Sequence, residues 1–222
     1  MAPNAQGRAL PRGPHGLSPD EVAQSQRFRL LTAMTDAVAE KGFANTVVAD
    51  VVARSGVSRA TFYKMFRDKE DCFQAAYDMN AALVARFMEM GLEELTGDER
   101  SSPIEKLERV LGLYIDALTS APAVARVFLV EVYAAGPEAI ARRRASLDRF
   151  VDIVAATHDG GIGLLGTRKS QRFAAEMIVN AVSAAVTNIV GVGDMDELQE
   201  LRKDLTDLAR RVLAAVATAE RP

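Results

Sequence analysis

The stretch VARSGVSRATFYKMF, residues 52–66, combines a central glycine with basic, hydroxyl-bearing and aromatic side chains. A helix turns by about 100° per residue, so a helix starting near Ser58 places its large apolar side chains on one face, namely Phe62, Met65 and Phe66. The other face then carries no acid, only Arg59, Ala60, Thr61, Tyr63 and Lys64. Such a face can donate hydrogen bonds to phosphate oxygens and contact base edges in a DNA groove.

The residues before this helix form a second helical pattern that ends at a glycine. Thr46 is the predicted N-cap of a helix over 46–55, and its valines turn inward before Gly56 stops it. Val57 is then expected to wedge between the two helices. A helix, a glycine turn and a short second helix are typical of a helix-turn-helix reader, whose second helix enters a major groove. From spacing alone, a solvated helical hairpin remains the alternative.

The rest of the chain predicts an all-α fold of about nine helices. Residues 1–17 are rich in proline and glycine and are expected to be a disordered arm. Ser18, Pro19 and Glu21 then form a capping box for a helix ending at Lys41-Gly42. Apolar periodicity predicts further helices at 46–55, 58–66, 69–95, 103–119, 121–135, 137–158, 168–190 and 195–218.

Composition limits the classes of function. The chain has 222 residues, 49% of them apolar, which is enough for a packed core. It shows neither a signal peptide nor an apolar run of membrane-spanning length, so we expect a cytoplasmic protein. With one cysteine and two histidines, we expect no disulfide, metal site, cofactor or catalytic cluster. Cys72 is expected to be a small buried hydrophobe rather than a reactive thiol.

Charge divides unevenly along the chain. Residues 1–67 hold nine Lys/Arg and five Asp/Glu, whereas residues 68–222 hold eighteen and twenty-five, which gives the overall charge of −3. A mildly basic N-terminal part can meet phosphate, and the acidic remainder would avoid it.

From about Phe28 to Tyr77 the chain resembles the DNA-binding domain of the tetracycline-repressor (TetR) family of transcriptional regulators. The matching elements are EKGFxxT, VVxxSGVSRATFYxxF and DKEDCF. The resemblance implies that DNA is contacted by Thr46, Thr61, Tyr63 and Lys64, with Arg59 and Ala60 at the reading tip. Ser58 adds the outward backbone N–H groups of a helix start. Lys69 is implied to meet phosphate, although its acidic neighbours also suit a simple cap-region charge.

The resemblance further implies a DNA-binding domain at 18–67 and a ligand-binding and dimerisation domain at 68–222. Apolar stripes in the second part are mostly core, but some of their members can line an apolar cavity between helices. Polar residues nearby are candidates for orienting a ligand. The candidate ligand-binding residues are Phe87, Phe128, Tyr133, Phe150, His158, Met177, Asn180 and Thr187.

The last two predicted helices favour a homodimer. The segment RFAAEMIVNAVSAAVTNIV is rich in small residues that let another helix approach closely, and the helix after it has a leucine and valine stripe. Paired with a twofold copy, they would form the four-helix interface that the resemblance implies. The alternative is that one monomer's own core uses the same residues. A dimer would place two reading heads about 34–36 Å apart or somewhat more on a palindromic DNA operator.

Two other patterns do not lead to a function. Residues 161–166 match GxGxxG, but a long helix precedes them where a nucleotide fingerprint needs a strand, so a loop is expected. Arg142, Arg143 and Arg144 can attract an anion, yet adjacent residues fan around a helix, and a solvated face is the expected arrangement.

The sequence therefore predicts a ligand-responsive transcriptional regulator, most simply a repressor, that binds double-stranded DNA as a homodimer and is released by a small apolar effector. One alternative is a helical ligand-binding or adaptor protein that does not read DNA. Another is a helical enzyme, for which the sequence offers no catalytic cluster.

Overall fold

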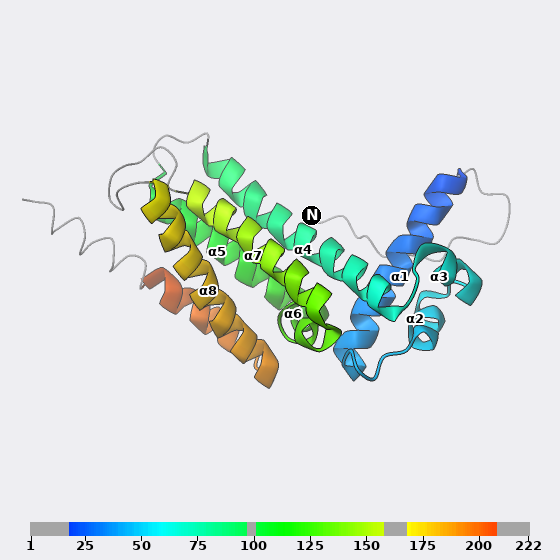
Figure 1. Cartoon of the computed structure of the whole chain (residues 1–222). Coiled ribbons are helices and arrows are strands. Elements are labelled where there is room, and N and C mark those ends of the chain that lie inside the picture. Colours follow the sequence, from blue (N-terminus) through cyan, green and yellow to red (C-terminus); the bar gives the residue numbers. More distant parts are fainter. Residues whose placement is uncertain (1–17, 97–100, 158–167, 208–222) are drawn as a thin grey trace, which may run out of the picture.

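The computed structural model describes residues 18–96, 101–157 and 168–207, and this part of the chain is helical without any strand (Figure 1). The predicted all-α fold is confirmed, whereas the predicted arm at 1–17 lies outside the described residues. The helices are α1 (Pro19–Lys41), α2 (Val48–Ser55), α3 (Arg59–Met65), α4 (Lys69–Thr96), α5 (Pro103–Ser120), α6 (Pro122–Leu129), the 3-10 helix η1 (Glu131–Ala135), α7 (Pro137–Ala156) and α8 (Arg168–Val192). Residues 197–207 are also helical.

Helix α1 begins as its capping signals predict. The Ser18 hydroxyl accepts a hydrogen bond from the Glu21 backbone N–H at 3.2 Å, and the Ser18 N–H donates to the Glu21 carboxylate at 2.7 Å. The bond from the Ser18 N–H to the Glu21 carboxylate, followed by the influence of the Ser18 hydroxyl, holds the pKa of Glu21 below its ordinary value. Pro19 occupies the first helical position, where its missing N–H is not needed. The capping box is thus confirmed.

Helices α1, α2 and α3 pack around a shared apolar core. Phe62 is fully buried and Phe66 almost so, and the predicted inward face of α3 is confirmed. Gly56 adopts the left-handed conformation, with φ +65°, and its N–H donates to the Val52 carbonyl. Val57, the next residue, is buried in the core with 4% of its surface exposed, as expected for a side chain that lies between the two helices.

Replacing Gly56 with alanine is expected to lower the free energy of unfolding by about 1–2 kcal/mol, because an L residue is strained in the left-handed region. A Cβ at this position would also meet the Arg29 guanidinium at 2.8 Å. Gly56→Asn adds the same Cβ, but asparagine tolerates this conformation better. Urea unfolding should therefore show a smaller loss for asparagine. Equal losses would assign the cost to the Arg29 contact instead of the backbone.

Helix α4 joins the first three helices to the rest of the molecule. Near its start, the Phe73 ring packs edge-on against Phe43 with 4.8 Å between centroids. Farther along, the Asn80 amide donates to the Thr35 hydroxyl of α1 at 2.9 Å in a buried contact. Cys72 is fully buried here, as predicted for a small hydrophobe, and burial raises its pKa to about 12. The second half of α4 belongs to the C-terminal bundle.

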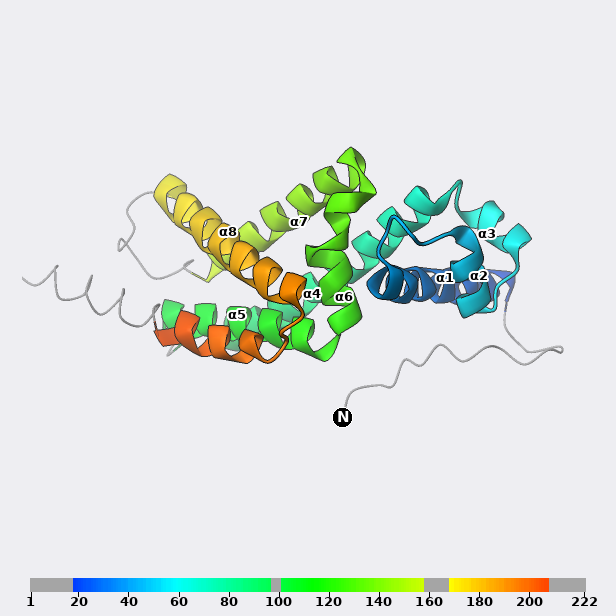
Figure 2. The ribbon, with the colours of Figure 1, turned by 90° about the horizontal axis from the view of Figure 1, so that it is seen from below.

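The C-terminal bundle is formed by α4, α5, α7 and α8, with α6 between these helices and α1 (Figure 2). The chain bends by 107° between α5 and α6. The bend falls at Ala121, because the residue before a proline is disfavoured in helical conformation, and Pro122 starts α6. Residues 197–207 return along α5, where Leu198 is fully buried and Arg202 pairs with Asp116 at 2.6 Å.

The prediction of one helix over 121–135 is wrong. Helix α6 ends at Leu129, and the 3-10 helix η1 follows after Val130. Glu131, the first residue of η1, turns inward and is only 8% exposed. Its carboxylate accepts a hydrogen bond from the backbone N–H of Phe43, 88 residues earlier, at 2.9 Å. The break between α6 and η1 places Glu131 where it can accept this hydrogen bond. The local apolar periodicity does not predict the break, because the partner is distant in sequence.

Candidate nucleic-acid interface

The outward face of α3 presents the residue types that the sequence analysis singled out. Ser58 caps the helix by accepting a hydrogen bond from the Thr61 N–H at 3.0 Å. Arg59, Ala60 and Lys64 are exposed, and half of the Tyr63 surface is accessible. Thr61 is partly buried, with its hydroxyl 2.9 Å from that of Ser58. The structure thus gathers Ser58, Arg59, Ala60, Tyr63 and Lys64 on one surface, called the α3 face below.

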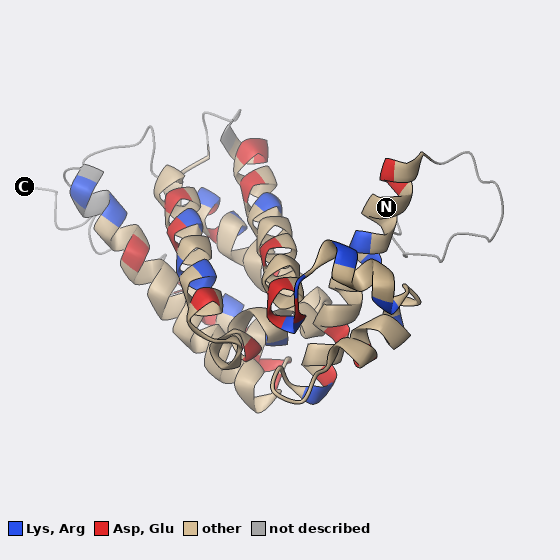
Figure 3. Ribbon diagram, turned by 45° about the vertical axis from the view of Figure 1, so that its right-hand side comes forward, with Lys and Arg blue, Asp and Glu red and all other residues tan. Residues whose placement is uncertain are grey.

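The α3 face is positively charged. The Arg59 guanidinium lies 5.7 Å from the centre of the Tyr63 ring, which orients both side chains outward along the helix. Among the described residues, neither Arg59 nor Lys64 forms an ion pair with a carboxylate. Figure 3 shows basic residues on this end of the molecule, while acids and bases alternate along the helices of the bundle. Both charges are therefore available to phosphate oxygens or base acceptors.

Thr46 and Lys69, which the family resemblance places at DNA, are engaged inside the protein. Thr46 is fully buried, and its hydroxyl donates to the Gly42 carbonyl at 2.8 Å. The N-cap of α2 is Val47 rather than the predicted Thr46, with the Asp50 carboxylate accepting from the Val47 N–H at 3.0 Å. Lys69 donates to the Phe43 carbonyl at 2.9 Å, and its ammonium lies 4.2 Å from the Phe43 ring centre.

A basic residue of α1 that the sequence analysis did not propose borders α3. Arg27 is exposed, and its guanidinium lies 4.7 Å from the centre of the Phe66 ring, just past the end of α3. It is a further candidate for a phosphate contact. No motif links it to α3, because the two are brought together by packing across almost forty residues of sequence.

The C-terminal bundle contains a small apolar cavity. It has a volume of about 20 Å³, enough for one water molecule. It lies between α4, α5, α7 and α8, and its walls include Met88, Leu111, Tyr114, Phe150, Val182 and Ser183. A drug-sized ligand needs roughly 300 Å³ or more. Such a ligand would have to part the helices in order to enter.

The candidate ligand-binding residues fall into three groups. Phe150 lines the cavity, and Phe128 is buried behind it with 5.9 Å between the ring centroids. The hydroxyls of Tyr133 and Thr187 lie beside the Arg143 guanidinium. Three others are exposed on the surface and do not line the cavity: Phe87, Met177 and Asn180. His158 lies outside the described residues.

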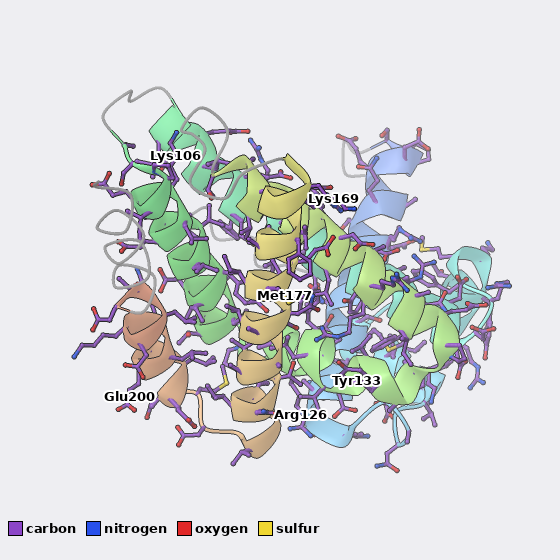
Figure 4. The ribbon with its side chains drawn as sticks, turned by 60° about the vertical axis from the view of Figure 1, so that its left-hand side comes forward. Lys106, Arg126, Tyr133, Lys169, Met177 and Glu200 are labelled. Carbon is purple, nitrogen blue, oxygen red and sulfur yellow. The ribbon has the colours of Figure 1, made fainter. Side chains whose placement is uncertain are left out.

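Helix α8 carries an exposed stripe of apolar and small residues, called the α8 stripe below. Its members recur at helical spacing on one side of the helix and are Phe173, Met177, Ala181, Ala184, Asn188 and Val192. Phe173 is 60% exposed and Val192 is 86% exposed. Figure 4 shows α8 with Met177 labelled. The opposite side of α8 packs against α7 and α6.

By length and composition alone, Arg172–Val192 would also pass for a membrane span. The core helix of a soluble protein, which is mostly buried, meets the same criterion, and 39% of the most apolar window is buried here. The exposed stripe of this helix is confined to one side, which suits a second helix better than lipid on all sides.

The comparisons with known proteins agree with this geometry. Residues 30–76 match the family model described as "Bacterial regulatory proteins, tetR family". FadR from Bacillus halodurans has a similar structure, with a TM-score of 0.69 and 20% identity over 90% of this chain and 96% of that one. FadR from Bacillus subtilis gives a TM-score of 0.67 and 20% identity over 82% and 96%. A TetR-like regulator from Rhodococcus sp. RHA1 has a TM-score of 0.62 and 22% identity, and the match covers 93% of this chain and 99% of that one.

Among curated protein sequences, none matches the chain significantly. The helix-turn-helix geometry and the matched residues are those of a DNA-binding regulatory domain, and a helical C-terminal part follows it. The match to the tetR family of bacterial regulatory proteins covers residues 30–76, and the solved structures extend the likeness in fold to the helical C-terminal part.

Proposed function

We propose that this protein is a ligand-responsive repressor, which binds a palindromic operator as a homodimer in the cytoplasm. Residues 18–67 are assigned to DNA binding, and residues 68–222 to effector binding and dimerisation. The observation that carries the proposal is the α3 face, where an arginine, a lysine and a tyrosine are exposed and no described acid pairs with them. An adaptor that had lost DNA binding would have no need of this surface.

Direct contacts with DNA are assigned to the α3 face and to Arg27. Arg59 and Lys64 suit guanine acceptors or phosphates, the Ala60 methyl group suits a thymine methyl, and the Tyr63 hydroxyl suits a phosphate. Thr46 and Lys69 are assigned an indirect role. Their side chains donate hydrogen bonds to the backbone around Phe43 and so position the segment that leads into α2. Ser58 and Thr61 secure the start of α3.

Dimerisation is assigned to the α8 stripe. An exposed row of apolar and small residues along a helix of 25 residues is unusual on a soluble monomer, and it lets two helix backbones approach closely. A twofold axis across α8 would bring the two stripes together and fix the separation of the two α3 faces.

Effector binding is assigned to the cavity of the bundle. FadR from Bacillus subtilis, which shares the fold, has been determined in complex with stearoyl-CoA. The cavity of this chain is apolar like the tail of such a molecule, but it is closed to about the size of one water. Opening it would move α4 and α7, which contact each other, and α4 also packs against α1 of the DNA-binding domain. Such movement supports opposing effects of effector and operator.

A contact between the two halves supports the same coupling. Glu131 of η1 accepts a hydrogen bond from the Phe43 N–H and pairs with Arg126 at 3.2 Å. Phe43 lies in the segment between α1 and α2. A shift of η1 would therefore reach the helix-turn-helix directly as well as through α4.

The proposed function is tested by selecting the fragments that the purified protein retains from a pool of random double-stranded DNA. An inverted repeat is expected, with half-sites whose centres are about 10 bp apart or somewhat more, because two identical heads face successive major grooves. Enrichment of a single unrepeated site would contradict the dimer. No enrichment over a wide range of salt concentration would contradict DNA reading itself.

A further inference from the structure

The middle residue of the arginine triplet is buried inside the C-terminal bundle. Arg142 pairs with Asp78 at the surface and Arg144 is exposed, as a solvated face requires. Arg143 is instead only 5% exposed, so the expected solvated face is wrong for this residue. The reason is the fan of adjacent residues around α7, which turns Arg143 toward α8.

The hydrogen bonds of Arg143 to the described residues all go to neutral oxygens. Its Nε donates to the Tyr133 hydroxyl at 3.0 Å, and one terminal nitrogen donates to the Ser183 hydroxyl at 2.8 Å. Longer contacts reach the Phe128 carbonyl at 3.4 Å and the Thr187 hydroxyl at 3.5 Å. In the part of the chain that the structure describes, no carboxylate pairs with Arg143, although seven other arginines after residue 68 have such a partner.

A buried arginine without a counterion is costly. Removing a guanidinium from water is unfavourable, and proteins normally offset it with a carboxylate or another anion. Hydroxyls and a carbonyl supply hydrogen-bond acceptors but no negative charge.

A second buried polar group in the same region lacks a hydrogen-bond partner in the described part of the chain. The Tyr77 hydroxyl on α4 is fully buried and has no hydrogen-bond partner of normal geometry among the described residues. Burial raises the pKa of Tyr77 to about 12, and the nearby Ser146 and Arg143 oppose that rise. The Tyr77 ring is stacked on Phe128 with 5.1 Å between centroids. A donor hydroxyl and a positive charge therefore lie in one buried neighbourhood.

This polar neighbourhood adjoins the apolar cavity. Ser183 both accepts a hydrogen bond from Arg143 and lines the cavity wall. Phe150 lines the cavity and contacts Phe128, which in turn stacks on Tyr77. A molecule that entered the cavity with an apolar body would bring its polar end toward Arg143.

We propose that Arg143 binds an anionic oxygen group, a carboxylate or a phosphate, at one end of an effector whose hydrocarbon part occupies the cavity. This inference rests on the proposed function, because it names the chemistry of the effector. The planar guanidinium can form two parallel bonds to such a group. Doing so would draw Arg143 away from Tyr133, which lies two residues from Glu131 on η1. Binding would thus disturb the contact of η1 with Phe43.

The test compares three probes of equal chain length by titration calorimetry on the full chain: octanoate, octyl phosphate and octan-1-ol. We expect at least one of the two anions to bind about tenfold more tightly than the alcohol, because hydrogen bonds to a buried charge are stronger than neutral ones. The stronger anion distinguishes carboxylate from phosphate. Equal affinity for all three probes, or no binding by any of them, would overturn the proposal.

The Arg143→Met variant should lose the preference for the anion, whereas the matched Arg142→Met variant should keep it. An anion preference that survives in Arg143→Met would overturn the proposal. If Arg143→Met does not fold, the Arg143→Lys variant is used in its place. A smaller ratio of anion to alcohol affinity than in the wild type then supports the proposal, and an unchanged ratio overturns it. Operator binding is measured on the same samples. A loss of operator binding in the wild-type protein would count against the proposed function. The ratio of anion to alcohol affinity would still test the role of Arg143.

Discussion

Replacing Arg59 and Lys64 together with alanine is expected to weaken operator binding by about a hundredfold or more without lowering the thermal unfolding temperature. Each good contact of a basic side chain with DNA contributes about 1–3 kcal/mol, and a dimer would lose every contact twice. Both side chains are exposed and take no part in the apolar core, so the fold should be unaffected. Fluorescence anisotropy with a labelled operator measures the affinity.

Salt dependence sharpens this prediction. For each phosphate contact that is lost, the slope of log affinity against log salt concentration should become shallower by about 0.9. A matched control removes two exposed basic residues from the bundle, with Arg144→Ala and Lys203→Ala combined. This control changes the net charge equally. If it weakened binding as much as the α3 variant, the effect would reflect overall charge and the assigned face would be wrong.

Replacing Ala184 with glutamate should convert the protein to a monomer and weaken operator binding by about a hundredfold or more. Ala184 lies in the middle of the α8 stripe and is exposed in the single chain. Across a twofold axis, the substitution would bury two like charges in an apolar contact, which is strongly unfavourable. Losing the second head removes the gain of about 10²–10⁴ that a linked pair of sites provides. Analytical ultracentrifugation and operator titration measure both effects.

The same substitution on another exposed helix serves as the control. Ala141 is an exposed alanine of α7 that lies off the α8 stripe. Ala141→Glu should leave both the dimer and the operator affinity unchanged. A dimer that persists in Ala184→Glu would show that the α8 stripe is covered by something other than a second copy, and the dimer assignment would have to move.

Features of the fold that depend on neighbouring residues were predictable from the sequence. The capping box at Ser18, the left-handed Gly56 and the inward side of α3 follow from local chemistry and periodicity, and the structure has all three. The exposed positions on α3 follow from the same periodicity, because a helix that buries Phe62 and Phe66 must turn Arg59 and Lys64 outward.

Features that depend on distant partners were not predictable. The break after Leu129 is tied to a hydrogen bond between Glu131 and Phe43, far apart in the sequence. Thr46 reads as an N-cap, but its hydroxyl bonds the Gly42 carbonyl of the preceding turn. Arg143 stands between two surface arginines, and only the packing of α7 against α8 distinguishes it from them. The pattern of residue types along one helix does not show which side of that helix packs against another helix. It also does not show which hydrogen-bonding group the other helix provides.

The burial of Cys72 makes this residue unsuited to sensing oxidants. The only cysteine of the chain lies in the packed core beside the helix-turn-helix, and its raised pKa keeps it in the unreactive thiol form at physiological pH. Peroxide or disulfide stress would therefore not act on DNA binding through this sulfur. The same burial leaves the native surface without a thiol, so a cysteine introduced on the α3 face would be the sole site for attaching a spectroscopic label to the folded protein.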